Sequence, residues 1–132
     1  MTAEASPAQA WGVETVDDIE AALTAAEDAV VPAERYVAAH RAALRVAAWV
    51  LASRRARLRG RRPSVWEVVA AIAPELAEWA AYFGALELKR QAVAAGAFAL
   101  VSTREADDLV RDARAFADAA RWYRGRGGAR HG

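Results

Sequence analysis

Large apolar residues recur at steps of three and four positions along most of the chain, and this spacing is typical of α-helices that pack through one face. Strict two-residue alternation, which would predict strands, is nearly absent. Alanine occurs 37 times, so a small number of larger side chains must supply most of the buried apolar area. We therefore expect an all-α fold with a thin core that a dimer would extend. The clearest stripe comprises Ala106, Leu109, Val110, Ala113, Phe116, Ala117, Ala120 and Tyr123.

The periodic segments and the residues between them predict an up-down bundle of four to five helices. Ser64 with Glu67, and Ser102 with Glu105, have the spacing of capping boxes and mark two helix starts. Gly96 is placed to end the fourth helix. Short connections between the helices favour antiparallel neighbours. The expected helices cover residues 15–31, 33–58, 65–73, 75–95 and 103–123.

This pattern divides the chain into a single bundle with two tails. Residues 1–14 lack periodicity and read as a disordered tail, residues 15–123 form the bundle, and residues 124–132 form a tail rich in Gly and Arg. The start of the chain has no basic region followed by an apolar stretch, so we expect no signal peptide. The longest apolar runs are too short to span a membrane. We expect a soluble, cytoplasmic protein.

Composition excludes several kinds of chemistry. The chain has no cysteine and two histidines, which excludes disulfides, thiol nucleophiles, Cys-ligated zinc and a His-rich metal site. Asp107 and Asp108 resemble paired aspartates that hold Mg²⁺, but Arg111 beside them neutralises such a site. We assign these acids to the helix start and to surface pairs of Asp107 with Arg111 and of Arg114 with Asp118. We expect neither a metal nor a cofactor.

The net charge of +1 conceals strong segregation of charge along the chain. Residues 1–34 carry eight acids and no base, whereas residues 35–62 carry nine arginines and no acid. A near-neutral total therefore does not exclude a polyanion as partner. It raises the question of whether the acidic first helix covers the arginines of the second.

Six arginines lie within nine residues at the expected end of the second helix. Guanidinium groups form planar forks that suit phosphate, so this cluster is a candidate site for RNA or another polyanion. The alternative is a solvated or structural role, because cations at a helix C-terminus complement the helix dipole. The candidate nucleic-acid-binding residues are Arg54, Arg55, Arg57, Arg59, Arg61 and Arg62.

Arg35 and His40 have the spacing of a known metal-independent ribonuclease motif. In that chemistry His acts as general acid or base, and Arg stabilises the charge on phosphorus. On a helical wheel, however, His40 lies mid-stripe between Tyr36 and Leu44, and Arg35 points roughly 140° away. We therefore favour a buried, hydrogen-bonded structural histidine and keep Arg35 and His40 as the alternative catalytic pair.

The helix AERYVAAHRAALRVAAWVL at residues 33–51 resembles the signature helix of the HEPN superfamily. The segments APELAEWA at 73–80 and TREADDL at 103–109 look like those of small single-domain HEPN proteins of actinobacteria. The resemblance implies a bundle of four to five helices that often dimerises. Many members are ribonucleases of toxin–antitoxin or defence systems, and others are non-catalytic. Catalytic members usually carry the arginine–histidine motif on a later helix, and here no histidine follows Arg90 or Arg104 at that spacing.

Three functions remain open from the sequence. The first is a non-catalytic interaction or nucleic-acid-associated module that contacts a polyanion or an acidic partner. The second is a metal-independent ribonuclease. The third is a purely structural bundle that binds a protein partner and whose acidic first helix covers its own arginine face. A homodimer is expected in each case.

Overall fold

The computed structural model describes residues 15–52 and 64–130, with side chains placed up to Gly125. The helices are α2 (Val16–Asp28), α3 (Pro32–Ala52), α4 (Val65–Ile72), α5 (Ala77–Ala85), α6 (Glu87–Ala94) and α7 (Thr103–Arg130). Two 3₁₀ turns, η1 (Pro74–Leu76) and η2 (Phe98–Leu100), lie between them. The described residues contain no strand, and the predicted all-α fold is confirmed.

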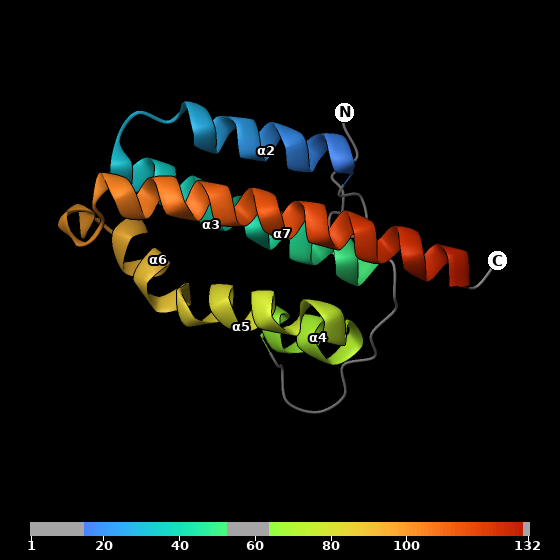
Figure 1. Cartoon of the computed structure of the whole chain (residues 1–132). Coiled ribbons are helices and arrows are strands. Elements are labelled where there is room, and N and C mark those ends of the chain that lie inside the picture. Colours follow the sequence, from blue (N-terminus) through green and yellow to red (C-terminus); the bar gives the residue numbers. More distant parts are fainter. Residues whose placement is uncertain (1–14, 53–63, 131–132) are drawn as a thin grey trace, which may run out of the picture.

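The helices α3 and α7 form the centre of the bundle and lie side by side (Figure 1). The helix α2 covers them on one side, and α4, α5 and α6 lie on the other side (Figure 1). Successive long elements alternate in direction, so α3 and α7 run the same way while α2 and the α5–α6 segment run against them (Figure 1). This is the up-down arrangement that the short connections predict.

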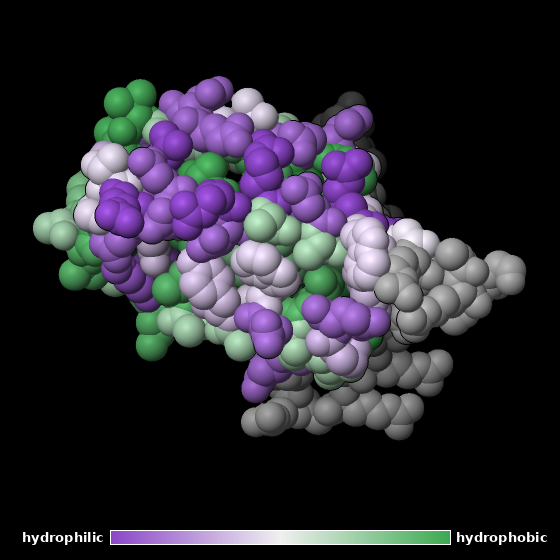
Figure 2. Space-filling view, in the orientation of Figure 1, coloured by the Kyte–Doolittle hydropathy of each residue, from purple (hydrophilic) through white to green (hydrophobic). Residues whose placement is uncertain are grey.

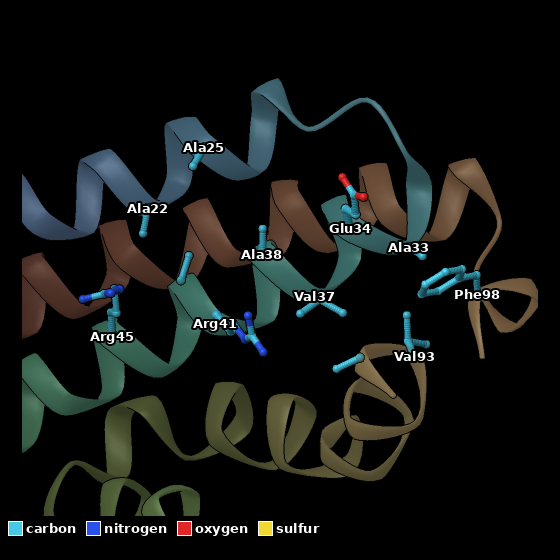
Figure 3. A pocket seen from close by; sticks show the side chains of 12 residues that line it. Ala22, Ala25, Ala33, Glu34, Val37, Ala38, Arg41, Arg45, Val93 and Phe98 are labelled. Carbon is cyan, nitrogen blue, oxygen red and sulfur yellow. The ribbon is translucent and has the colours of Figure 1, made fainter. Parts of the chain in front are cut away.

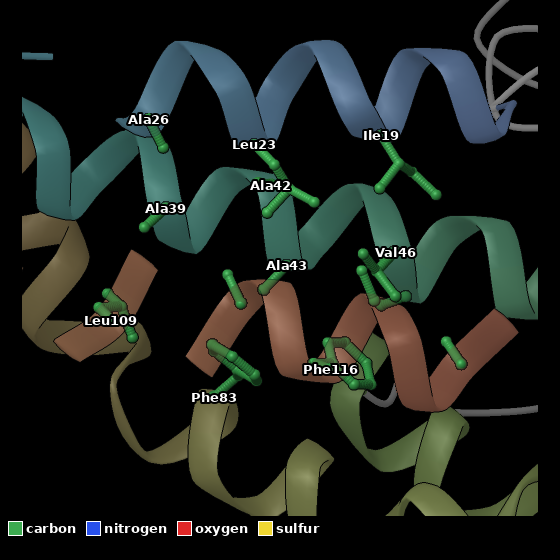
Figure 4. Close-up of a cluster of buried hydrophobic side chains, with 14 of the residues drawn as sticks. Ile19, Leu23, Ala26, Ala39, Ala42, Ala43, Val46, Phe83, Leu109 and Phe116 are labelled. Atoms are coloured by element: carbon green, nitrogen blue, oxygen red, sulfur yellow. The ribbon is translucent and has the colours of Figure 1, made fainter. Parts of the chain in front are cut away.

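Small side chains on α3 allow this close packing. Ala39, Ala42 and Ala43 are fully buried, and Figure 4 shows them between α2 and the elements on the opposite side. Alanine side chains occupy little of the space between helices, so the backbones approach closely and the larger side chains fill the space that remains. Those larger residues include Leu23 of α2, Phe83 of α5, and Leu109 and Phe116 of α7.

The predicted helix starts are confirmed by their hydrogen bonds. Ser64 accepts from the Glu67 amide at 3.1 Å, and the Glu67 carboxylate accepts from the Ser64 amide at 2.9 Å. Ser102 and Glu105 make the same reciprocal pair, with both distances 3.0 Å. Each box satisfies two backbone donors that a helix start would otherwise leave unpaired.

Three helix bounds differ from the sequence expectation. The expected helix 75–95 is divided into η1, α5 and α6, with a break at Leu86. The first helix ends at Asp28, and Val30, which the spacing placed in its apolar stripe, is 91% exposed. The last helix continues through Arg130, beyond the apolar stripe that ends at Tyr123. Apolar periodicity reports the face that is buried, and it does not report where backbone hydrogen bonding stops.

Gly96 ends α6 through backbone hydrogen bonds that need a left-handed residue. The Gly96 amide donates to Val93 O at 3.0 Å, and the Ala97 amide donates to Ala92 O at 3.0 Å. This pair of bonds is a Schellman motif. Gly96 has φ +123°, a conformation that side chains make costly. The turn sends the chain into η2 and then into α7.

We predict that Gly96→Ala lowers the free energy of unfolding by about 1–3 kcal/mol, because the new side chain strains the backbone. Urea denaturation followed by circular dichroism measures this loss. Gly125→Ala is the matched control, because Gly125 lies in α7 with open space around its Cα, where alanine is the better helix former. A loss in both variants, or in neither, would contradict the role given to Gly96.

Candidate functional site

His40 lies in the middle of α3 and is fully buried. Its Nε2 lies 2.9 Å from the backbone oxygen of Phe83. Because a carbonyl oxygen only accepts, Nε2 must carry the proton and donate to it. The Nδ1 atom then keeps its lone pair and has no hydrogen-bond partner among the described residues. His40 is therefore held as one defined neutral tautomer inside the bundle.

The acceptor of this bond lies at the junction between α5 and α6. Phe83 O also accepts from the Leu86 amide at 3.1 Å, which is a tight turn rather than a continuing α-helical bond. Leu86 has φ −92° and ψ 0° and separates the two helices. The bond from His40 thus satisfies a carbonyl at the point where the helix is interrupted.

Aromatic rings surround the imidazole. The rings of Trp66 and Phe83 each meet His40 edge-on, with ring centroids 5.9 Å away. Trp66 and Phe83 stack on each other at 5.5 Å, and Phe116 of α7 contacts both. These rings exclude water from the imidazole and pack α4, α5 and α7 around α3.

Charged groups reach the edge of this cluster from α6. The Glu87 carboxylate accepts from Trp66 Nε1 at 3.2 Å and from the guanidinium of Arg90. Its Oε1 lies 3.7 Å from His40 Nε2, a distance too long for a hydrogen bond. Burial lowers the pKa of His40 below its ordinary value of 6.5, and the Phe83 carbonyl and Glu87 offset this only in part. Since His40 is neutral, its approach to Glu87 is not an ion pair.

Glu87 is held in the charged form. Burial raises the pKa of its carboxyl, but the hydrogen bonds from Trp66 and Arg90, with the charges nearby, bring the pKa below its ordinary value. The side chains of Glu87, Arg90 and Trp66 therefore close the site around His40. The sequence singled out none of them as site residues, and their spacing carries no signal that would do so.

Arg35 is directed elsewhere. Its Nη1 donates to the backbone oxygen of Glu27 at 3.2 Å, and its Nε lies 3.1 Å from Asp107. These contacts join the end of α2 and the start of α7 to the start of α3. The structure gives Arg35 and His40 no common partner, and the pair stays a prediction as a catalytic unit.

The six clustered arginines, Arg54, Arg55, Arg57, Arg59, Arg61 and Arg62, lie outside the described residues. The described part of the arginine-rich region includes Arg41 and Arg45, which are both exposed on α3. They stand four residues apart and so lie on the same face of the helix. The polyanion site predicted from the cluster stays a prediction.

Arg41 and Arg45 border a groove of about 500 Å³ between α2, α3 and the α6–η2 segment. Ala22, Ala25 and Val37 contribute to its apolar lining. Figure 3 shows the two arginines along α3, with Val93 and Phe98 towards the other end. The groove therefore combines an apolar surface with the positive charge of Arg41 and Arg45 at one end and the carboxylate of Glu34 towards the other. Sequence reasoning missed it, because its walls come from segments far apart in the chain.

Apolar residues are exposed near the α2–α3 connection and in η2. Val30, Val31, Phe98 and Leu100 are 91%, 45%, 60% and 51% exposed. Figure 2 shows hydrophobic side chains gathered at the end of the molecule where these segments lie. Large apolar residues that are exposed close together mark interaction surfaces more often than isolated ones do.

The acidic helix α2 pairs with α7. Arg114 Nε lies 2.9 Å from Glu27, and its Nη1 lies 3.2 Å from Glu20. The expected pair of Arg114 with Asp118 is therefore replaced by two contacts across the bundle. Asp107 likewise meets Arg35 at 3.1 Å, and Arg111 meets Asp108 at 3.1 Å. Although α2 packs on α3, Arg41 and Arg45 remain exposed, so α2 does not cover this part of the arginine face.

We predict that His40→Gln lowers the free energy of unfolding at pH 7.5 by about 1–3 kcal/mol, because it disturbs a buried hydrogen bond. The depressed pKa of His40 means that the unfolded chain takes up this proton first as the pH falls below about 6.5. The stability that the wild type gains from the neutral, buried His40 is therefore fully present above that pH and declines below it. The gap in the free energy of unfolding between wild type and variant should shrink as the pH falls from about 6.5 to 5.

Urea denaturation at several pH values measures this gap. Tyr123→Phe is the matched control, because it removes a hydroxyl that donates to Ile72 O at 3.2 Å and replaces it with a side chain that has no ionisable group. Its cost should be independent of pH between 7.5 and 5. A gap for His40→Gln that stays constant with pH would show that His40 titrates alike in both states.

No helix among the described residues is both long and apolar enough to cross a membrane. The compartment of the protein stays a prediction.

Comparison with protein families gives a match over most of the chain. The family described as SAV_6107-like HEPN matches residues 26–121, which extend from the end of α2 to the C-terminal half of α7. Searches of curated proteins and of solved structures found no match. The matched segment contains α3 with His40, the α5–α6 junction and most of α7. The chain therefore belongs to the SAV_6107-like HEPN family.

Proposed function

We propose that this HEPN protein is a non-catalytic module that binds RNA, a polyanion, along the face of α3 that carries Arg41 and Arg45. The observation that carries the non-catalytic part of the proposal is the complete burial of His40, whose Nε2 proton is donated to Phe83 O. A general base must reach the group from which it takes a proton. Here Nε2 is engaged with Phe83 O, and Nδ1, the atom that keeps the lone pair, is buried among aromatic rings where no substrate reaches it.

Anion binding is supported by the described part of α3. Arg41 and Arg45 are exposed on one face of the helix, and α3 leads towards the segment that contains six arginines. The planar guanidinium group forms paired hydrogen bonds with phosphate oxygens. Contacts of this kind give affinity and salt dependence without reading sequence. RNA is the partner that this proposal names, and an acidic protein is the other outcome of the test.

The ribonuclease alternative requires a rearrangement of the cluster around His40. Arg35 would have to leave Glu27 and Asp107, and His40 would have to leave Phe83 and become accessible to solvent. Each change breaks contacts that hold helices together. The homodimer predicted from the thin core is also retained as a proposal, with the exposed apolar end around Phe98 as its candidate surface.

We predict that the double variant Arg41→Ala with Arg45→Ala binds RNA more weakly and with a shallower dependence on salt. Each lost contact to single-stranded RNA should reduce the slope of log affinity against log salt by about 0.7. Fluorescence anisotropy of a labelled RNA oligomer between about 50 and 200 mM salt measures the slope. The matched control is Arg104→Ala with Arg111→Ala, which removes the same charge from exposed positions on α7.

Equal losses in the two double variants would show non-specific attraction and overturn the assignment to α3. Affinity without a salt slope would overturn the RNA proposal in favour of another partner. The same samples, incubated with EDTA and examined on a denaturing gel, should contain intact RNA. Cleavage by the wild type that disappears in a folded His40→Gln variant would establish the ribonuclease instead.

A further inference from the structure

A second and smaller cleft lies between α5 and α7, on a different part of the surface from the groove. Glu78, Trp79 and Tyr82 of α5 and Asp112 of α7 line it, and its volume is about 330 Å³. Nothing in the proposed binding of RNA uses these residues. The cleft combines two aromatic rings with two carboxylates, and this combination favours a particular class of ligand.

The aromatic walls of the cleft are held in place from behind and from the side. Trp79 is half-buried and stacks on Phe83 with ring centroids 6.2 Å apart, and Phe116 lies 6.0 Å from it. Tyr82 meets Trp79 edge-on at 6.4 Å and is 39% exposed. The Tyr82 hydroxyl donates to Asp112 Oδ2 at 2.5 Å. A bound side chain would therefore meet rings that are already ordered, so little entropy is lost in fixing them.

The electrostatics of the cleft favour a cation. Glu78 is exposed and makes no hydrogen bond or ion pair with any described residue. Asp112 accepts from Tyr82, and its other oxygen lies 3.9 Å from Arg111, a side chain that is 70% exposed. Asp108 adds a further carboxylate close by, which meets Arg111 at 3.1 Å. Within the described part of the chain, these carboxylates outnumber Arg111, the arginine that faces them, and aromatic ring faces add negative potential.

We propose that this cleft binds an arginine side chain presented by a segment of a partner protein. A planar guanidinium group stacks on an aromatic ring and at the same time donates paired hydrogen bonds to a carboxylate. Glu78 is the carboxylate that has no partner among the described residues, and Tyr82 is the exposed ring beside it. A lysine ammonium is a more strongly hydrated point charge and gains less from the flat ring.

A divalent metal ion fits the cleft less well. Ca²⁺ takes six to eight oxygen ligands, and Mg²⁺ needs an octahedral set. Of the residues that line the cleft, Glu78 and Asp112 supply the carboxylates, and one oxygen of Asp112 is already engaged by Tyr82. The indole and phenol rings supply surface and no strong ligands. The chemistry of the lining thus fits an organic cation.

The test uses the full-length protein labelled with ¹⁵N and a blocked tripeptide that has arginine between two glycines. The indole N–H signal of Trp79, assigned with Trp79→Phe, should shift on titration with up to about 10 mM peptide. The same peptide with citrulline, which keeps the shape and loses the charge, should produce no comparable shift. The peptide with lysine should bind more weakly than the arginine peptide.

Tyr82→Ala and Glu78→Gln should each lower the affinity for the arginine peptide by about two- to fivefold. Asp17→Asn is the matched control, because it removes one exposed carboxylate from α2, away from the cleft. Its affinity should equal that of the wild type. Unchanged circular dichroism in all three variants shows that the bundle is intact.

The proposal is overturned if the Trp79 signal does not move, or if citrulline shifts it as strongly as arginine. It is also overturned if lysine binds as tightly as arginine, or if Asp17→Asn weakens binding as much as Glu78→Gln does. None of these outcomes bears on RNA binding by α3, because the assay contains no RNA and leaves Arg41 and Arg45 intact.

Discussion

The hydrogen bond from His40 to Phe83 O is the contact on which the arrangement of the bundle depends. It joins the centre of α3 to the junction of α5 and α6, across 43 positions of sequence. Around it, the rings of Trp66, Phe83 and Phe116 bring α4, α5 and α7 against the same helix. A buried polar group of this kind is costly when unpaired and specific when paired, so it fixes one packing of an otherwise alanine-rich core.

This use of the histidine relates the fold to the proposed function. The HEPN superfamily includes ribonucleases in which an arginine and a histidine act together, yet here Arg35 and His40 each hold helices together through separate partners. In the proposed function, the surface of the bundle serves binding. The arginines of α3 border an apolar groove, and the cleft between α5 and α7 presents carboxylates beside aromatic rings. The two surfaces suit partners of opposite charge.

Local sequence signals predicted much of the fold. The capping boxes at Ser64 and Ser102 and the turn at Gly96 depend on residues within a few positions, and the structure confirms them. The preference for a buried structural His40 over a catalytic one also came from local spacing, because His40 lies in the apolar stripe of its helix.

The break at Leu86 and the two binding surfaces could not be predicted in this way. Leu86 interrupts a segment that is apolar and helical in pattern, and the Phe83 carbonyl at this break accepts from His40 of another helix as well as from the Leu86 amide. Arg114 has an acid four residues later, yet it pairs with α2 because the fold places Glu20 and Glu27 beside it. The groove and the cleft likewise combine residues that become neighbours only after folding.

The most direct test is the protonation state of His40, observed through long-range ¹H–¹⁵N correlation spectra of the imidazole as the pH is lowered. We expect the proton on Nε2 and none on Nδ1, with no change in the His40 signals from pH 8 to below the ordinary titration range near about 6.5. A proton on Nδ1, or a titration at the ordinary pKa, would contradict this. Either result would show that His40 is not held as the neutral Nε2–H tautomer inside the bundle, and it would return the arginine–histidine pair to the position of a candidate catalytic site.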